Sequence, residues 1–295
     1  MGMYINHNSM ATNVANNLNK SYGNLATSTQ RLSSGLRVNS AADDAAGLAI
    51  RELMRSDISA LNQGVRNAND AISMIQTADG ALGIIDEKLV RMKELAEQAA
   101  TGTYDSTQRL MIESEYQAMA SEITRIANST DFNGIHLLNG NLSGSHKGGA
   151  MTSKGEMKIH FGSANDCAED YYYVRIGTST ASALGLGSQS ANNAGKSIST
   201  QSAAQAALVA VQDAIVSKDK IRAHLGGLQN RLENTVSNLK IQSENLAAAE
   251  SRISDVDVGT EMTQFVRNQI LTQSAVAMLS QANGMPRMAM QLIGG

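Results

Sequence analysis

The chain has 295 residues, a net charge of −3, and 42% hydrophobic but only 3% aromatic residues. This charge argues against nucleic-acid binding through electrostatics, and one cysteine, Cys167, excludes an intrachain disulfide or a multi-cysteine metal site. We expect Cys167 to be an ordinary thiol. Few aromatic residues and a single proline, Pro286, favour long helices in slender packing.

The first element that we expect is a helix over residues 1–30, a stretch with one ionised side chain, Lys20. Its apolar residues recur at helical spacing. The candidate contact residues on it are Met10, Val14, Leu18 and Leu25. An apolar face beside an uncharged polar face is poorly suited to free solution. We therefore expect this end of the chain to bind other protein.

The next segment predicts a break in the helix at Gly35, after which Asn39 or Ser40 caps a second helix. Asp43 and Asp44 then fall in its first turn, where the helix dipole favours negative charge. An aspartate pair could instead bind a metal. Adjacent residues on a helix diverge by about 100°, however, and no histidine lies nearby. We expect a structural elbow.

Residues 50–100 carry apolar side chains at steps of three and four, from Ile50 to Ala99, which predicts a long helix with a coiled-coil seam. Gly102 interrupts it, and Ser106 can cap a shorter helix with its own apolar seam. The short reversal between the two seams indicates antiparallel packing.

The middle of the chain is rich in glycine and contains two expected strands, 157–162 and 171–178, which form a β-hairpin insert. A second long helix follows over roughly residues 200–254. Leucine or isoleucine recurs on it every seven residues, at Leu225, Leu232, Leu239, Leu246 and Ile253. The last helix, 262–295, has only two ionised side chains. Its candidate contact residues are Phe265, Ile270, Val276 and Leu279.

Five stretches together closely resemble bacterial flagellin, the subunit of the flagellar filament. They are QRLSSGLRVNSAADDAAGLAI at 30–50, TDFNG at 130–134, ASALGL at 181–186, SRISDVD at 251–257 and QAN at 281–283. The resemblance covers roughly residues 3–140 and 180–295. The large outer domains of long flagellins are absent from the expected organisation, which fits the small insert.

The resemblance implies a mainly α fold: a long antiparallel helical rod or coiled-coil bundle with paired terminal helices and a small β-hairpin insert. The expected segments are 1–40 and 256–295 for an inner domain, 41–140 and 196–255 for a rod, and 141–195 for the insert. The chain would assemble head-to-tail with itself into the filament for swimming motility. Its terminal helices would fold only on assembly.

The resemblance also implies export, unfolded, through the flagellar type III apparatus to an extracellular filament. The start of the chain lacks the pattern of a cleaved signal peptide, and no run of eighteen apolar residues predicts a membrane span. Expected partners are hook-associated junction and cap proteins and an export chaperone. The chaperone surface would comprise Phe265, Ile270, Val276 and Leu279.

A further surface implied by the resemblance is the one that a Toll-like innate immune receptor recognises in many flagellins. Arg91, Leu95 and Glu115 fall on the corresponding positions, whereas Lys93 and Glu97 depart from the usual residues. The added acidic group could weaken an apolar contact. Alternatively, the charged residues serve the filament's own lateral contacts.

No catalytic constellation is present, because the five histidines are scattered without metal-ligand spacing and no HExxH motif occurs. We expect neither an enzyme nor a metal or cofactor site. Two alternatives to a filament subunit stay open. One is a hook–filament junction protein with the same terminal-helix organisation; the other is a secreted adhesin or receptor-binding module whose function lies in the insert.

Overall fold

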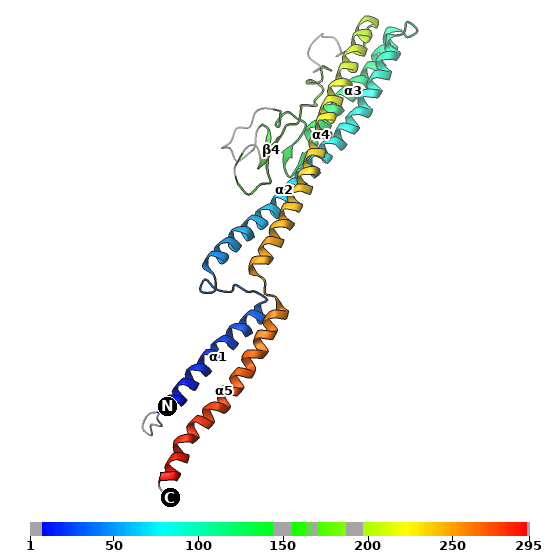
Figure 1. Ribbon diagram of the computed structural model, residues 1–295. Coiled ribbons are helices and arrows are strands. Elements are labelled where there is room, and N and C mark those ends of the chain that lie inside the picture. The colour runs from blue at the N-terminus through cyan, green and yellow to red at the C-terminus, as the bar shows by residue number, and fades with distance from the viewer. Residues whose placement is uncertain (1–7, 144–154, 165, 167–169, 187–196, 294–295) are drawn as a thin grey trace. The chain divides into compact units, whose positions relative to one another are not determined.

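The computed structural model describes residues 8–143, 155–164, 166, 170–186 and 197–293 (Figure 1). The described helices are α1 (Ser9–Ser34), α2 (Ala45–Ala100), α3 (Ser106–Ser129), α4 (Gln201–Ser254) and α5 (Val258–Ile293). The described strands are β1 (Asp131–Phe132), β2 (Ile135–His136), β3 (Met157–His160) and β4 (Tyr171–Val174). The expected mainly α fold with a small hairpin is confirmed. Cys167 and much of the expected insert lie outside the described residues.

Contacts divide the chain into two compact units. Unit 1 comprises Met1–Ile58 and Glu244–Gly295, and unit 2 comprises Ser59–Ser243. Unit 1 therefore combines both ends of the chain with the first turns of α2 and the last turns of α4. Unit 2 holds α3, all four strands and the remainder of α2 and α4.

In unit 2, α2 packs beside its neighbour α3 and beside the sequence-distant α4, and both run antiparallel to it (Figure 1). Four hydrogen-bonded side-chain pairs define the register of α2 and α4: Asn62 with Ser243, Asp79 with Arg222, Asp86 with Lys218, and Lys93 with Gln212. The α2 members of the last three pairs lie seven residues apart. One face of α2 therefore carries polar partners at heptad spacing beside its apolar seam.

The core of unit 2 follows the predicted seam of α2 from Leu61 to Ala99, where all the seam side chains except the half-buried Val65 and Ile72 are buried. Leu225, Leu232 and Leu239 of the α4 heptad series are also buried, whereas Leu246 and Ile253, in unit 1, are only half-buried. The prediction fails at the start of α2, where the Ile50 side chain is 46% exposed. The apolar seam thus becomes a core only where α3 and the strands cover it.

A two-residue turn that the sequence reasoning missed joins β1 to β2. Asn133 and Gly134 both have positive φ, 51° and 79°, as a type I′ hairpin turn requires. The Asn-Gly dipeptide was the available signal. The predicted capping of α3 was also wrong by one residue. Asp105 is the N-cap, and its backbone N–H donates to Oε1 of Gln108 at 3.1 Å.

The β3–β4 hairpin lies where the sequence predicted strands, although both strands are shorter than expected. It packs against α2 at Gly64, where an added Cβ would overlap the backbone carbonyl of Phe161. Nδ2 of Asn67 donates to the carbonyl oxygen of His160 at 2.8 Å. On the α4 side, the Arg231 guanidinium lies 3.6 Å from the centre of the Tyr172 ring. The hairpin is therefore fixed to both long helices of unit 2.

Replacing Gly64 with alanine should destabilise unit 2 by about 1–3 kcal/mol, because the new methyl group must displace the hairpin backbone. Gly80, on the same helix, has open space at its Cβ position. Gly80→Ala should therefore stabilise the protein by about 0.5–1 kcal/mol through helix propensity alone. Urea unfolding followed by circular dichroism measures both variants. Equal effects at the two positions would contradict the proposed packing of the hairpin.

The Lys218 side chain is only 1% exposed, and its ammonium contacts Asp86 at 2.5 Å and Asp219 at 2.8 Å. Asp86→Ala should lower the free energy of unfolding by about 1–3 kcal/mol, since a buried ammonium loses its partner on the facing helix. Asp219 is 60% exposed, and Asp219→Ala should cost less than about 1 kcal/mol. Adding Lys218→Met to Asp86→Ala should recover stability in the same urea titration. A double variant no more stable than Asp86→Ala argues against a buried-charge penalty.

Candidate assembly surface

The two ends of the chain form an antiparallel helix pair in unit 1. Near one end of the pair, Nδ2 of Asn8 donates to the carbonyl oxygen of Ala282 at 2.8 Å. Near the other end, Arg31 and Glu261 form an ion pair at 3.7 Å. Between these points the Cα atoms of α1 and α5 approach within 8 Å. The register therefore holds along the whole of α1.

Side chains on the facing sides of α1 and α5 are small, polar or only half-buried. Ser28 of α1 and Asn268, Thr272 and Ala282 of α5 are buried. The Thr272 hydroxyl donates to the backbone carbonyl of Asn268 at 2.7 Å, so its polar group is satisfied within the helix. Small residues on the facing sides explain how two helices can approach so closely. Among the described residues of the two helices, no large apolar side chain is fully buried.

Large apolar side chains instead cover the sides of the pair that face away. On α5 the Ile270 side chain is 56% exposed and Val276 is 47% exposed. Leaving aside Val258, the first residue of α5, we call the exposed large side chains on both helices the outer terminal surface. It comprises Met10, Tyr22, Met262, Val266, Ile270, Leu271, Val276, Met278 and Met288. A helix that is apolar on several sides is normally buried, so α5 presents a surface suited to being covered by protein.

The structure divides the eight candidate contact residues of the terminal helices into two groups. Met10, Ile270 and Val276 belong to the outer terminal surface. The other five are half-buried, on the sides where α1 and α5 face each other: Val14, Leu18, Leu25, Phe265 and Leu279. Sequence reasoning missed Tyr22, Leu271, Met278 and Met288, because a search for one apolar stripe overlooks a helix that is apolar on several sides.

Two connecting segments meet at an elbow at the base of the helix pair. Gly35 ends α1 with φ of 72°, the left-handed conformation that glycine adopts at little cost. Its carbonyl oxygen accepts the backbone N–H of Val256 at 3.0 Å, and the backbone N–H of Arg37 donates to Ser254 at 2.6 Å. Nη2 of Arg37 donates to the carbonyl oxygen of Ile253, also at 2.6 Å. The end of α4 is therefore capped by the segment that follows α1.

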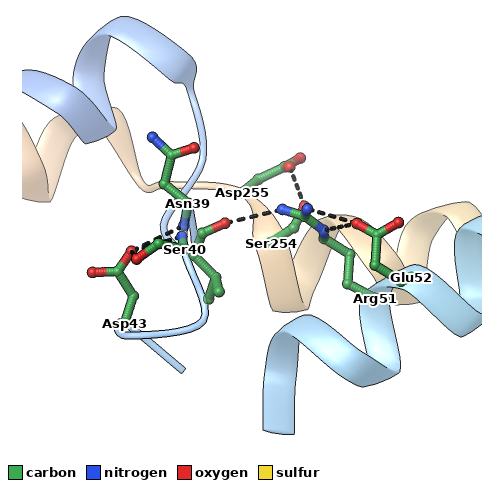
Figure 2. A network of polar contacts seen from close by, with 8 residues as sticks. Asn39, Ser40, Asp43, Arg51, Glu52, Ser254 and Asp255 are labelled. Carbon is green, nitrogen blue, oxygen red and sulfur yellow. Dashed lines mark hydrogen bonds and ion pairs between the residues drawn. The ribbon is translucent and has the colours of Figure 1, made fainter. Parts of the chain in front are cut away.

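The aspartates of the elbow correct the sequence prediction. Neither Asn39 nor Ser40 caps a helix. Instead, Oδ2 of Asp43 accepts hydrogen bonds from both of their backbone N–H groups and from the Ser40 hydroxyl (Figure 2). These bonds, that from the Ser40 backbone foremost, lower the pKa of Asp43. Asp44 precedes α2 and accepts the Gly47 N–H at 2.9 Å, so the helix begins at Ala45.

Arg51 ties the first turns of α2 to the elbow. Nη1 of Arg51 donates to the carbonyl oxygen of Val38 at 2.9 Å, and Nη2 pairs with Glu52 at 2.7 Å (Figure 2). On the other connecting segment, Asp255 accepts from the buried Ser254 hydroxyl at 2.8 Å. The elbow thus gathers residues from stretches 30–50 and 251–257, which are distant in sequence.

Asp257 caps α5 in the same region. Its carboxylate accepts the backbone N–H groups of Gly259 and Thr260 and the Thr260 hydroxyl. The bond from the Thr260 backbone is the largest cause of a lowered pKa for Asp257. A carboxylate at this position also interacts favourably with the N-terminal end of the α5 dipole. The start of α5 is therefore fixed beside the pairing of the two connecting segments.

The candidate receptor surface lies in unit 2, on α2 and α3. Arg91 pairs with Glu115 at 2.8 Å and with Glu94 at 3.0 Å, and all three side chains are at least 44% exposed. Leu95 lies elsewhere: its side chain is 1% exposed and belongs to the core of unit 2. The structure thus brings Arg91 and Glu115 together at the surface, while Leu95 supports them from inside.

Among the described residues, no group of three or more His, Cys, Asp or Glu side chains could hold a metal ion. None of the helices in the described ranges combines the length and apolar character that a membrane span needs. Two grooves of about 290 and 350 Å³ flank the β3–β4 hairpin.

Comparisons with known proteins agree with this organisation. Residues 5–143 match the family described as the bacterial flagellin N-terminal helical region, and residues 208–293 match its C-terminal helical region. The chain is 41% identical to a flagellar filament core protein of Brachyspira hyodysenteriae, over 99% of this chain and 100% of that protein. It is also 41% identical to flagellin of Bacillus subtilis, over the same shares of the two chains.

Among solved structures, a hook-associated protein from Vibrio parahaemolyticus described as putative has the same fold, with a TM-score of 0.55. It is 14% identical, and the match covers 72% of this chain and 100% of that one. The likeness at this identity concerns the fold alone. The two matched regions and the whole-length relatives settle the family: this chain belongs to the bacterial flagellins, the subunits of the flagellar filament.

Proposed function

We propose that this flagellin polymerises head-to-tail through the outer terminal surface, which neighbouring subunits cover in the filament. The observation that supports the proposal most directly is the arrangement of α5, which buries Asn268 and Thr272 but exposes Ile270 and Val276. Burying those apolar side chains against other subunits supplies the free energy that the α1–α5 pair lacks by itself. A contact between different surfaces of identical subunits produces an open helical filament when it does not close into a ring.

Because the pair buries little apolar area internally, we propose that α1 and α5 become fully ordered only as the subunit joins the filament. The entropic cost of ordering them is then offset by contacts with neighbouring subunits. An unfolded or partly folded chain also suits export through the narrow filament channel. The assembled protein would be extracellular.

The same apolar residues suit a cytoplasmic export chaperone before assembly. Ile270 and Val276 are accessible while α5 is paired with α1, whereas Phe265 and Leu279 are half-buried. We propose that the chaperone binds α5 separated from α1, so that all four side chains enter its groove. Occupying α5 in this way prevents early polymerisation. Hook-associated junction and cap proteins would contact the same helices at the two ends of the filament.

In the assembled subunit, the elbow would join an inner domain of terminal helices to an outer rod with the hairpin insert, in the segments expected from the sequence. The exposed Arg91–Glu115 pair is the candidate for recognition by a Toll-like innate immune receptor. Leu95 would contribute there only indirectly, by supporting the helix surface from the core. Lateral contacts within the filament are an alternative use of the same charges.

Ile270→Glu should raise the critical concentration for polymerisation by about tenfold or more, because a charge would be buried without a partner. Gln269→Glu adds the same charge at a neighbouring exposed position. It should change the critical concentration by less than about twofold. Purified monomer seeded with filament ends and viewed by negative-stain electron microscopy, with sedimentation of the polymer, measures both. Normal elongation by Ile270→Glu would exclude this part of the surface from assembly.

Acid should weaken the elbow. The pKa values of Asp43 and Asp257 lie below the ordinary value of 3.8, so their stabilising hydrogen bonds are complete above that pH. They are lost as the pH falls through the lower pKa of the folded state. Asp43→Asn combined with Asp257→Asn keeps both acceptors but cannot titrate.

The double variant should therefore need a lower pH than the wild type to dissociate its polymer, as measured by light scattering across a pH series. Asp213→Asn, at an exposed position on α4, is the control and should leave the midpoint unchanged. If the double variant dissociates at the wild-type pH, these two carboxylates do not set the acid sensitivity.

A further inference from the structure

Four methionines belong to the outer terminal surface. Met10 is 50% exposed, Met262 44%, Met278 58% and Met288 50%. Two methionines of unit 2, Met74 and Met92, are by contrast buried in its core, at 1% and 0% exposure. The chain thus places one set of thioethers in solvent on the surface assigned to assembly and shields another set. Solvent access largely decides which methionines an oxidant reaches.

We propose that Met10, Met262, Met278 and Met288 form an oxidation-sensitive site at which peroxide switches off polymerisation of the free subunit. The proposal rests on the assembly role argued above for the outer terminal surface, and it adds regulation of that surface. Its chemistry follows from the side chain. A thioether is apolar and flexible and packs well in contacts between proteins, whereas its sulfoxide is polar.

The modification is a two-electron oxidation by hydrogen peroxide. A lone pair on Sδ attacks one peroxide oxygen, an S–O bond forms and the O–O bond breaks. The departing hydroxide takes up the proton of the transferred hydroxyl group and leaves as water. Sulfur is oxidised to the sulfoxide and peroxide is reduced. Methionine sulfoxide reductases reverse the change, with one enzyme for each sulfoxide epimer.

Oxidation would act on assembly because all four side chains become buried between subunits in the proposed filament. A buried sulfoxide oxygen without a hydrogen-bond donor disfavours the contact. The cost recurs in every subunit and at up to four positions, so it adds along the polymer. Burial also implies that the assembled filament protects the same methionines. The free subunit should therefore be sensitive and the filament resistant.

The first test treats wild-type monomer and preformed filaments with the same hydrogen peroxide concentration and maps each methionine by peptide mass spectrometry. We expect sulfoxide at Met10, Met262, Met278 and Met288 in the monomer, much less at these positions in filaments, and little at Met74 and Met92 in either. The critical concentration of the oxidised monomer should rise by about tenfold or more. Equal oxidation of the four positions in monomer and filament would overturn the proposal.

The second test assigns the effect to these positions. A variant with all four residues replaced by leucine is assayed before and after peroxide treatment. Treatment should raise its critical concentration by less than about twofold, compared with about tenfold for the wild type. Met111, in unit 2, is 70% exposed and lies outside the outer terminal surface. Met111→Leu should polymerise normally when untreated and stay fully sensitive to peroxide. A quadruple variant that remains as sensitive as the wild type contradicts the assignment.

The third test uses wild-type protein alone, so it holds even if the quadruple variant does not assemble. Treating oxidised monomer with both sulfoxide reductases should restore the original critical concentration, and mass spectrometry should show the four sulfoxides removed. Failure to recover after complete reduction would show that other damage caused the loss. The untreated wild type separates this proposal from the assembly role itself: if it does not polymerise, the assembly role fails, whereas peroxide-resistant polymerisation refutes only the oxidation switch.

Discussion

The antiparallel pairing of two connecting segments, 35–38 and 253–257, is the contact on which the terminal helix pair depends. The hydrogen bonds from Val256 to Gly35 and from Arg37 to Ser254 bring the end of α1 beside the start of α5. Gly35 permits the left-handed turn at the end of α1, and Asp257 caps the start of α5. The starting point and direction of both helices are therefore fixed at the elbow, and their register follows from there.

The pair of terminal helices, α1 and α5, is unusual in which of its residues are buried. Most helices of globular proteins turn their apolar side inward. In the pair formed by α1 and α5, the fully buried residues are small or polar, such as Ser28, Asn268 and Thr272, while the large apolar residues are half-buried or exposed. The pair can approach closely, but it gains little from the hydrophobic effect. In the proposed filament, contacts with neighbouring subunits would supply the stabilisation that the pair lacks.

Helical periodicity predicted the parts of the structure that form their own core. From Leu61 to Ala99 the apolar seam of α2 is buried as expected, apart from the half-buried Val65 and Ile72, because α3, α4 and the strands cover it. Leu95 is buried next to the seam residue Ala96, as its place beside the apolar seam indicates. The resemblance to a receptor-binding stretch had instead suggested a surface position for Leu95. Periodicity was uninformative for α5, where apolar residues lie on several sides of the helix.

The elbow could be recognised from sequence as an interruption, but its hydrogen bonds could not be predicted. Which aspartate caps α2 depends on where the chain turns after Val38, and that turn is fixed by contacts with segment 253–257 and with Arg51. Segment 253–257 is more than 200 residues away in sequence: Arg37 and its partner Ile253 are separated by 216 positions. Local propensity alone cannot choose among Asn39, Ser40 and Asp44 as the cap.

The hydrogen bond between Asn8 and Ala282, which joins residues 274 positions apart, also bears on the order in which the chain folds. Closing a loop of that length in an unfolded chain costs about 5 kcal/mol of entropy. Once the α2–α4 contacts of unit 2 have formed, down to Asn62 and Ser243, only the two short ends remain to be closed. Unit 2 should therefore fold first and the terminal pair last. A chain with this folding order leaves its two terminal helices unpaired for the longest time.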